Sequence, residues 1–227
     1  MNRHNPLLFG LFAILSTTSM AQFNEKGTIH LAIGTALGAH GTEYTWTQRI
    51  IFFGTPITLS DTETDGAATV TVPVEMDFGV TNRFSMGFYL EPGMYLDSNN
   101  TESNTLFLGG LQPRFYLING DRFALLAGAQ IGLAGLKIDR SESTTVGGVN
   151  VLNESSASYA GGGFGLGAGA VFQFSELIGL QLHLRYMATN MKLRDYTING
   201  NDVDDDDFEA TLRTRGIGMQ LSLGFRF

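Results

Sequence analysis

Charged side chains recur at alternate positions within apolar stretches of this sequence. Glu75 and Asp77 stand two residues apart, Glu91 follows in the next stretch, and Arg114 and Arg185 belong to two later ones. Charges that are taken out of water must be paired with each other or stay solvated. We therefore expect an internal salt-bridge network in which Glu75 or Glu91 reaches Arg114 and Arg185.

Other polar side chains share the face of these acids and bases. The predicted polar network consists of Glu75, Asp77, Tyr89, Glu91, Gln112, Arg114, His183, Arg185 and Arg226. We interpret it as structural, a set of side chains that holds the shape of the fold. We expect no catalytic, cofactor-binding or metal-binding residues in the chain.

Two further motifs have weaker chemical interpretations. Residues 165–170 read Gly-Leu-Gly-Ala-Gly-Ala, which resembles a dinucleotide fingerprint but lacks the strand before it and the helix after it. Residues 202–209 are rich in Asp and could bind a divalent cation, although they lack the spacing of a calcium loop. We favour the interpretation of residues 202–209 as a solvated run of charges.

The element that positions these side chains is a β-strand with one apolar and one polar face. Residues 68–80 alternate strictly, and residues 84–96 repeat the pattern after a connection of three residues. Side chains at alternate positions of a strand point to opposite faces of the sheet. Six more segments show the same period, near residues 27–39, 105–118, 123–137, 158–174, 179–194 and 216–227.

The connections between these eight segments alternate in length. Long polar links are expected at residues 40–67, 98–103, 139–157 and 195–209, and short turns at 81–83, 119–122 and 175–178. This alternation is typical of bacterial outer-membrane barrels, which have short periplasmic turns and longer outside loops. It places both ends of the chain on the side of the short turns.

The bulk composition and the N-terminus indicate an exported protein. The chain has 227 residues, no Cys and a net charge of -8, which exclude a disulfide framework and make nucleic acid an unsuitable partner. Arg3, a short apolar stretch and Ser19-Met20-Ala21 are typical of a signal peptide. We expect residues 1–21 to be removed and residues 22–227 to form one domain.

A secreted β-sandwich would also alternate apolar and polar residues, with the apolar face inward. Against it, the segments are about 10–15 residues long, whereas strands in globular proteins are usually about 5–6. The polar faces are rich in Gly and almost free of Lys, apart from Lys137. We predict an all-β fold, an eight-stranded antiparallel up-and-down transmembrane β-barrel.

The chain resembles the OmpA/OmpX-type, porin-like family of outer membrane β-barrels. The resemblance rests on the eight-strand plan and on the segment from Ile217 to Phe227. Apolar residues at every second position lead to a terminal Phe, similar to the signal that the barrel assembly machinery reads. The corresponding residues here are Met219, Leu221, Leu223, Phe225 and Phe227. The resemblance implies location in the bacterial outer membrane and biogenesis through that machinery.

Some barrels of this kind are lipid-modifying enzymes that use a His and a Ser near the outer rim. The corresponding stretch, residues 185–190, carries Met187 and Thr189 instead. We therefore expect a non-enzymatic protein with a structural or surface-interaction role and a lumen plugged by polar side chains. A small porin-like channel and a lipid-modifying enzyme are the alternatives. The expected partners are outer-membrane lipid and extracellular ligands of loops 40–67, 139–157 and 195–209.

Overall fold

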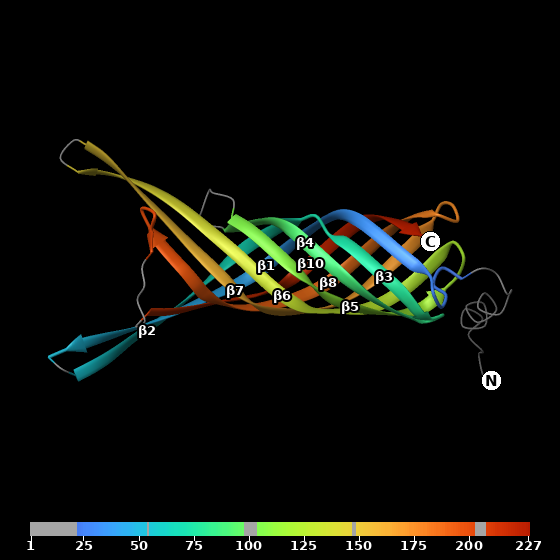
Figure 1. Ribbon diagram of the computed structural model, residues 1–227, viewed down its shortest axis with the longest axis horizontal. Coiled ribbons are helices and arrows are strands. Elements are labelled where there is room, and N and C mark those ends of the chain that lie inside the picture. The colour runs from blue at the N-terminus through green and yellow to red at the C-terminus, as the bar shows by residue number, and fades with distance from the viewer. Residues whose placement is uncertain (1–21, 54, 98–103, 147–148, 203–207) are drawn as a thin grey trace, which may run out of the picture.

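The computed structural model describes residues 22–53, 55–97, 104–146, 149–202 and 208–227. They form one antiparallel sheet whose first strand pairs with its last, so that the sheet closes into a ring (Figure 1). The strands are β1 Ile29–Phe52, β2 Thr55–Thr71, β3 Val74–Thr81, β4 Phe84–Asp97, β5 Asn104–Asn119, β6 Phe123–Val146, β7 Val149–Gln173, β8 Ile178–Ile198, β9 Asn201–Asp202 and β10 Phe208–Arg226. The predicted ring of eight strands is confirmed, with β2 and β3 sharing one place in it and β9 extending a hairpin.

The segment at residues 68–80, which we predicted as one strand, is divided in two. Strand β2 ends at Thr71 and β3 begins at Val74, on either side of Pro73. Proline has no N–H to donate to a sheet ladder, so it is tolerated only at edges and breaks. The Gly34 N–H of β1 still bonds to the Pro73 carbonyl at 3.0 Å, which keeps the two parts in the same wall.

The long links are largely hairpins rather than loops. Strands β1 and β2 stay paired as far as Phe52 and Thr55, and β6 and β7 as far as Val146 and Val149. The prediction of loops was therefore wrong over most of residues 40–67 and 139–157. In the third link, 195–209, strand covers residues 195–198, 201–202 and 208–209, and residues 203–207 lie outside the described residues. These segments are polar but rich in Thr, Val and Ile, which favour extended backbone, and a hairpin beyond the membrane can expose polar residues on both faces. The fourth link, residues 98–103, lies outside the described residues, as do residues 1–21, which we predicted to be a signal peptide.

The two faces of the wall follow the predicted alternation. Outward apolar side chains are exposed, among them Leu133 at 72% and Ile217 at 69%, whereas their neighbours Ala134 and Gly218 face inward. An outward apolar band is what a lipid-facing barrel presents. No helix among the described residues is long and apolar enough to cross a membrane.

The last strand completes the wall. Strand β10 pairs with β1 over residues 208–226 and with β8 over residues 211–225, so it leaves no open edge at this place. Four residues of the predicted assembly signal lie along it and Phe227 follows its end, and Met219, Leu221 and Leu223 point outward. Closure matters because backbone groups in hydrocarbon must be paired within the protein. The recognition of these residues during assembly stays a prediction.

Candidate functional site

We call the end of the barrel that carries the short turns its lower end. Near this end, an ion-paired layer centred on Arg114 of β5 crosses the lumen. Its guanidinium contacts two carboxylates of β3, the Glu75 Oε2 at 2.7 Å and the Asp77 Oδ2 at 2.5 Å. All three side chains are at most 5% exposed. Amide groups satisfy the remaining carboxylate oxygens, because Gln220 donates to Glu75 at 3.0 Å and Gln112 donates to Asp77 at 3.3 Å.

A second ion pair lies between β4 and β8. Both terminal nitrogens of Arg185 donate to the Glu91 carboxylate, one of them to Oε2 at 2.5 Å. The Thr71 hydroxyl donates to the same oxygen at 3.3 Å, and Gln130 also contacts this pair. A two-pronged Arg–carboxylate contact fixes both side chains in orientation. The structure thus joins residues that are 94 positions apart in the sequence.

Glycines that face these polar side chains leave room for them in the lumen. A Cβ atom added to Gly87 would lie 2.1 Å from Asp77 Oδ1, and one added to Gly169 would lie 2.4 Å from His183 Cδ2. The high Gly content of the inward face is therefore a packing requirement, because long polar side chains need short neighbours in a narrow lumen.

Three residues of the predicted network lie apart from the two ion pairs. Tyr89 forms no ion pair and is buried in an apolar cluster, although it pairs with Glu75 across the strands. His183 is buried beside a cavity of about 30 Å³ that Arg114 also lines. Arg226 lies at the mouth where the chain termini meet the barrel, and its guanidinium is 3.9 Å from Glu25. The structure does not bring Arg226 into either ion-paired layer.

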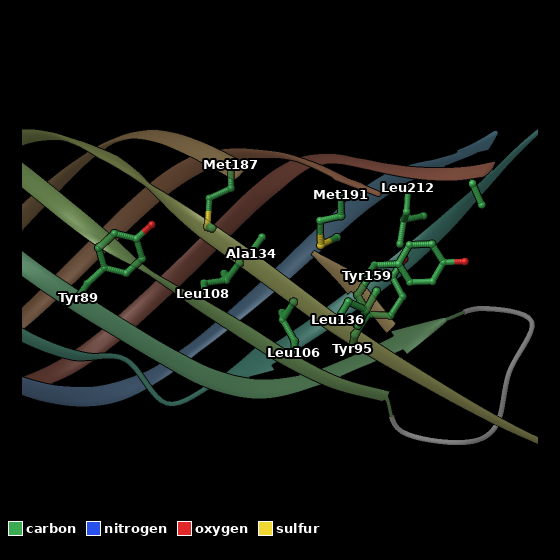
Figure 2. Close-up of a cluster of buried hydrophobic side chains, with 11 residues drawn as sticks. Tyr89, Tyr95, Leu106, Leu108, Ala134, Leu136, Tyr159, Met187, Met191 and Leu212 are labelled. Carbon is green, nitrogen blue, oxygen red and sulfur yellow. The ribbon is translucent and has the colours of Figure 1, made fainter. Parts of the chain in front are cut away.

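Above the ion pairs an apolar layer fills the lumen (Figure 2). Its buried residues are Tyr89, Tyr95, Leu106, Leu108, Ala134, Leu136, Tyr159, Met187, Met191, Ala210 and Leu212. Sequence reasoning missed this layer, although a signal for it existed. Leu106 and Leu108 stand at even positions, as Gln112 and Arg114 do, so all four lie on the inward face of β5. This face therefore changes from apolar to polar along the strand.

The mouth of the barrel at the end of the short turns is closed by residues that precede the first strand, which sequence reasoning also missed. Phe23 is 3% exposed and its ring stacks on His30 at a centroid distance of 4.3 Å. Asn24 is fully buried, and its side-chain amide donates to the Thr81 carbonyl at 2.7 Å. Its backbone N–H donates to the Asn119 side chain at 2.8 Å. This segment tethers two turns and seals the lumen from below.

At the opposite end the barrel holds an open vestibule of about 1010 Å³. Tyr95, Tyr159 and Leu212 line it and also belong to the apolar layer, which therefore forms its floor. Carboxylates from β2, β4, β8, β9 and β10 and basic groups from β6 and β8 line its sides. These charged residues are Glu63, Asp65, Asp97, Asp195, Asp202 and Glu209, and Arg140, Lys192 and Arg194.

The hydroxyl and imidazole groups of the lumen do not assemble a relay among the described residues. The His40 Nε2 lies 3.0 Å from the Thr69 hydroxyl, but its Nδ1 is buried without a partner. A catalytic base needs a third group that orients it. Thr189, in the stretch compared with lipid-modifying enzymes, is hydrogen-bonded to Thr214 at 2.8 Å. In the described part of the chain, no group of three or more His, Asp or Glu residues could hold a metal ion.

Comparison with one solved structure, that of OprG, supports the fold. The outer membrane protein OprG from Pseudomonas aeruginosa superimposes with a TM-score of 0.55 and 8% identity over 90% of this chain and 97% of OprG. Ail, the attachment invasion locus protein of Yersinia pestis, gives a TM-score of 0.41 and 13% identity over 89% of this chain and 99% of Ail. The outer membrane protease OmpT from Escherichia coli gives 0.39 and 11% over 93% of this chain and 100% of OmpT.

No curated protein matches the chain. The family described as the outer membrane protein beta-barrel domain matches residues 9–215, which is most of the sequence. Family and fold together indicate the bacterial outer membrane as its location. The chain belongs to the outer membrane protein beta-barrel domain family.

Proposed function

We propose that this protein is a closed outer-membrane barrel with a structural and surface-interaction role, and that its lumen does not conduct ions. The observation that carries the proposal is the stack of ion-paired layers around Arg114 and Arg185 beneath an apolar layer. An eight-stranded barrel has an interior just wide enough for side chains to fill. A path for ions would have to cross both salt bridges and then the apolar layer, and apolar side chains across a pore oppose the passage of water and ions.

The parts of the molecule available to partners lie at the outer end. The vestibule is open there, and the hairpins at residues 40–67 and 139–157 extend beyond the ring (Figure 1). We propose that extracellular ligands meet these hairpins and residues 195–209, while outer-membrane lipid contacts the apolar band. Loops and hairpins on a rigid barrel are common carriers of such recognition.

Conductance in a planar lipid bilayer tests the proposal. The folded protein, checked by the faster gel mobility of the unheated sample, is expected to give no steady current. Steady open-channel steps would support the alternative of a small porin-like channel and contradict the closed lumen. Incubation with lipid A tests the other alternative, a lipid-modifying enzyme, because loss of an acyl chain from lipid A would show enzymatic activity.

A further inference from the structure

The tip of the β1–β2 hairpin exposes an unusual concentration of apolar side chains. We call residues 49–53 and 55–59 the hairpin tip. Within it Ile51 is 74% exposed, Phe52 58% and Phe53 94%, and Ile57 and Leu59 are also exposed. Contiguous exposed apolar residues mark an interaction site more often than single ones do.

Both faces of the tip are apolar. The cross-strand pair of Ile50 and Ile57 lies on one face, and the next pair, Ile51 and Pro56, lies on the other. A hairpin that docks into a protein groove buries one face and keeps polar residues on the other, with a period of two. Apolar residues on both faces are suited to immersion in an apolar medium on all sides, which is the property of a lipid bilayer.

At the turn, a bulky aromatic residue takes a backbone conformation that is unfavourable for it. Phe53 has a positive φ of 48°, a conformation that bulky residues rarely adopt and that Asn or Gly adopts readily at such a turn. Its ring packs edge-on against Phe52 with a centroid distance of 4.6 Å. The strained residue thus contributes an exposed aromatic pair that a turn-forming Asn would not provide.

The hairpin lifts its tip away from the membrane that holds the barrel. Along β1, Leu37 is the last exposed large apolar residue before the polar stem, and Phe53 follows sixteen positions later. At about 3.3 Å per residue and a strand tilt near 40°, the tip stands about 40 Å above the apolar band. Between them lies a polar stem in which Thr45 bonds to Thr62 and Thr47 to Ser60. The tip points away from the chain ends in Figure 1.

The charges around the hairpin tip indicate which kind of lipid surface it could enter. Arg49 is the single charged residue between Gln48 and Ser60, and the carboxylates of Asp61 and Glu63 follow directly in the stem. A guanidinium can bond to a lipid phosphate, whereas the stem acids repel a strongly anionic surface once the tip has entered. Phe and Leu side chains of segments that lie on a bilayer bury themselves at the boundary between headgroups and acyl chains.

We propose that the hairpin tip inserts into the headgroup region of a second, apposed lipid bilayer with zwitterionic headgroups. The inference rests on the proposed surface-interaction role and names its partner. Phe52 and Phe53 enter the apolar boundary, Arg49 contacts phosphate, and Asp61 and Glu63 limit the depth of insertion. The barrel remains in its own membrane while the stem spans the gap.

Binding to vesicles tests this inference with the full barrel held in a nanodisc. The probe is a phosphatidylcholine vesicle, and binding is measured by flotation. Phe52→Ser combined with Phe53→Asn, which suits the positive φ, is expected to weaken binding at least about tenfold because the exposed apolar area is lost. Phe174→Ser is the matched control, since Phe174 is an aromatic residue beside a short turn at the opposite end of the barrel and 70% exposed. It is expected to leave binding unchanged.

A Trp reporter identifies the membrane that the tip enters. In a Trp46→Phe, Phe53→Trp variant, brominated lipid is placed either in the vesicles or in the nanodisc. Quenching from the vesicles is expected. Quenching only from the nanodisc, pairing of nanodiscs without vesicles, or equal vesicle binding by the Phe52/Phe53 variant would each overturn the inference. None of these results bears on conductance, so failure here and failure of the proposed function are told apart.

Discussion

Removal of the Arg114 guanidinium is the perturbation whose cost follows most directly from the structure. In Arg114→Met the side-chain stem is kept, but Glu75 and Asp77 lose their ion-pair partner while both carboxylates are at most 2% exposed. Each keeps one amide donor, from Gln220 at 3.0 Å and from Gln112 at 3.3 Å. Breaking a buried ion pair by removing one partner costs about 3–5 kcal/mol. We expect the free energy of unfolding to fall by about that amount.

The assay is equilibrium unfolding by urea in lipid vesicles, followed by the difference in gel mobility between folded and unfolded barrel. The exposed pair of Lys137 and Asp139, 3.1 Å apart and each about half exposed, provides the matched control. Lys137→Met is expected to change stability by less than about 1 kcal/mol because surface pairs contribute little. A change in Arg114→Met no larger than in Lys137→Met would refute the reasoning.

Neutralising the whole layer separates charge from packing. In the triple variant Glu75→Gln, Asp77→Asn, Arg114→Met no uncompensated charge remains, so most of the lost stability should return. If the triple variant were as unstable as Arg114→Met alone, the cost would come from packing around the Arg114 stem. The ion-pair account would then be wrong.

Three further predictions concern other levels of the barrel. Phe23→Ala should lower stability by about 2–4 kcal/mol by opening the lower seal, measured by the same unfolding assay. Gly87→Ala should cost about 1–3 kcal/mol because the new methyl group meets Asp77, whereas Gly66→Ala, with open space at its Cβ, should cost under about 1 kcal/mol. Phe227→Ser should slow insertion by the reconstituted assembly machinery without changing the unfolding free energy by more than about 1 kcal/mol, and an unchanged insertion rate would contradict the assembly signal.

The sequence predicted the strands and their two faces because a period of two reports directly which side chains share a face. Pairs such as Glu91 with Arg185 could be proposed only as alternatives, since their meeting depends on the register of every strand between them. The ring places β4 and β8 opposite each other. No local sequence pattern encodes the level along the barrel at which Glu91 and Arg185 meet. Arg226 shares the inward parity but lies at the mouth of the barrel.

Two features were missed for a different reason. An alternating pattern classifies Leu106 and Leu108 as inward without showing that they stand in one layer with Met187 and Met191 from β8. The seal around Phe23 has no strand period, so its contacts depend on tertiary structure. The length of the hairpins was underestimated because polar composition was taken to indicate loops, although Thr-rich segments form paired strands readily.

The central claim is that the apolar faces of a closed ring point into lipid, and site-directed spin labelling tests it most directly. The natural chain has no Cys, so Leu133→Cys on the outer face and Thr62→Cys on the hairpin stem give single sites. In vesicles the label at residue 133 should be relaxed by oxygen and hardly by a water-soluble nickel complex, with the reverse at residue 62. Protection of residue 133 from both reagents, as in the core of a soluble sandwich, would contradict the account.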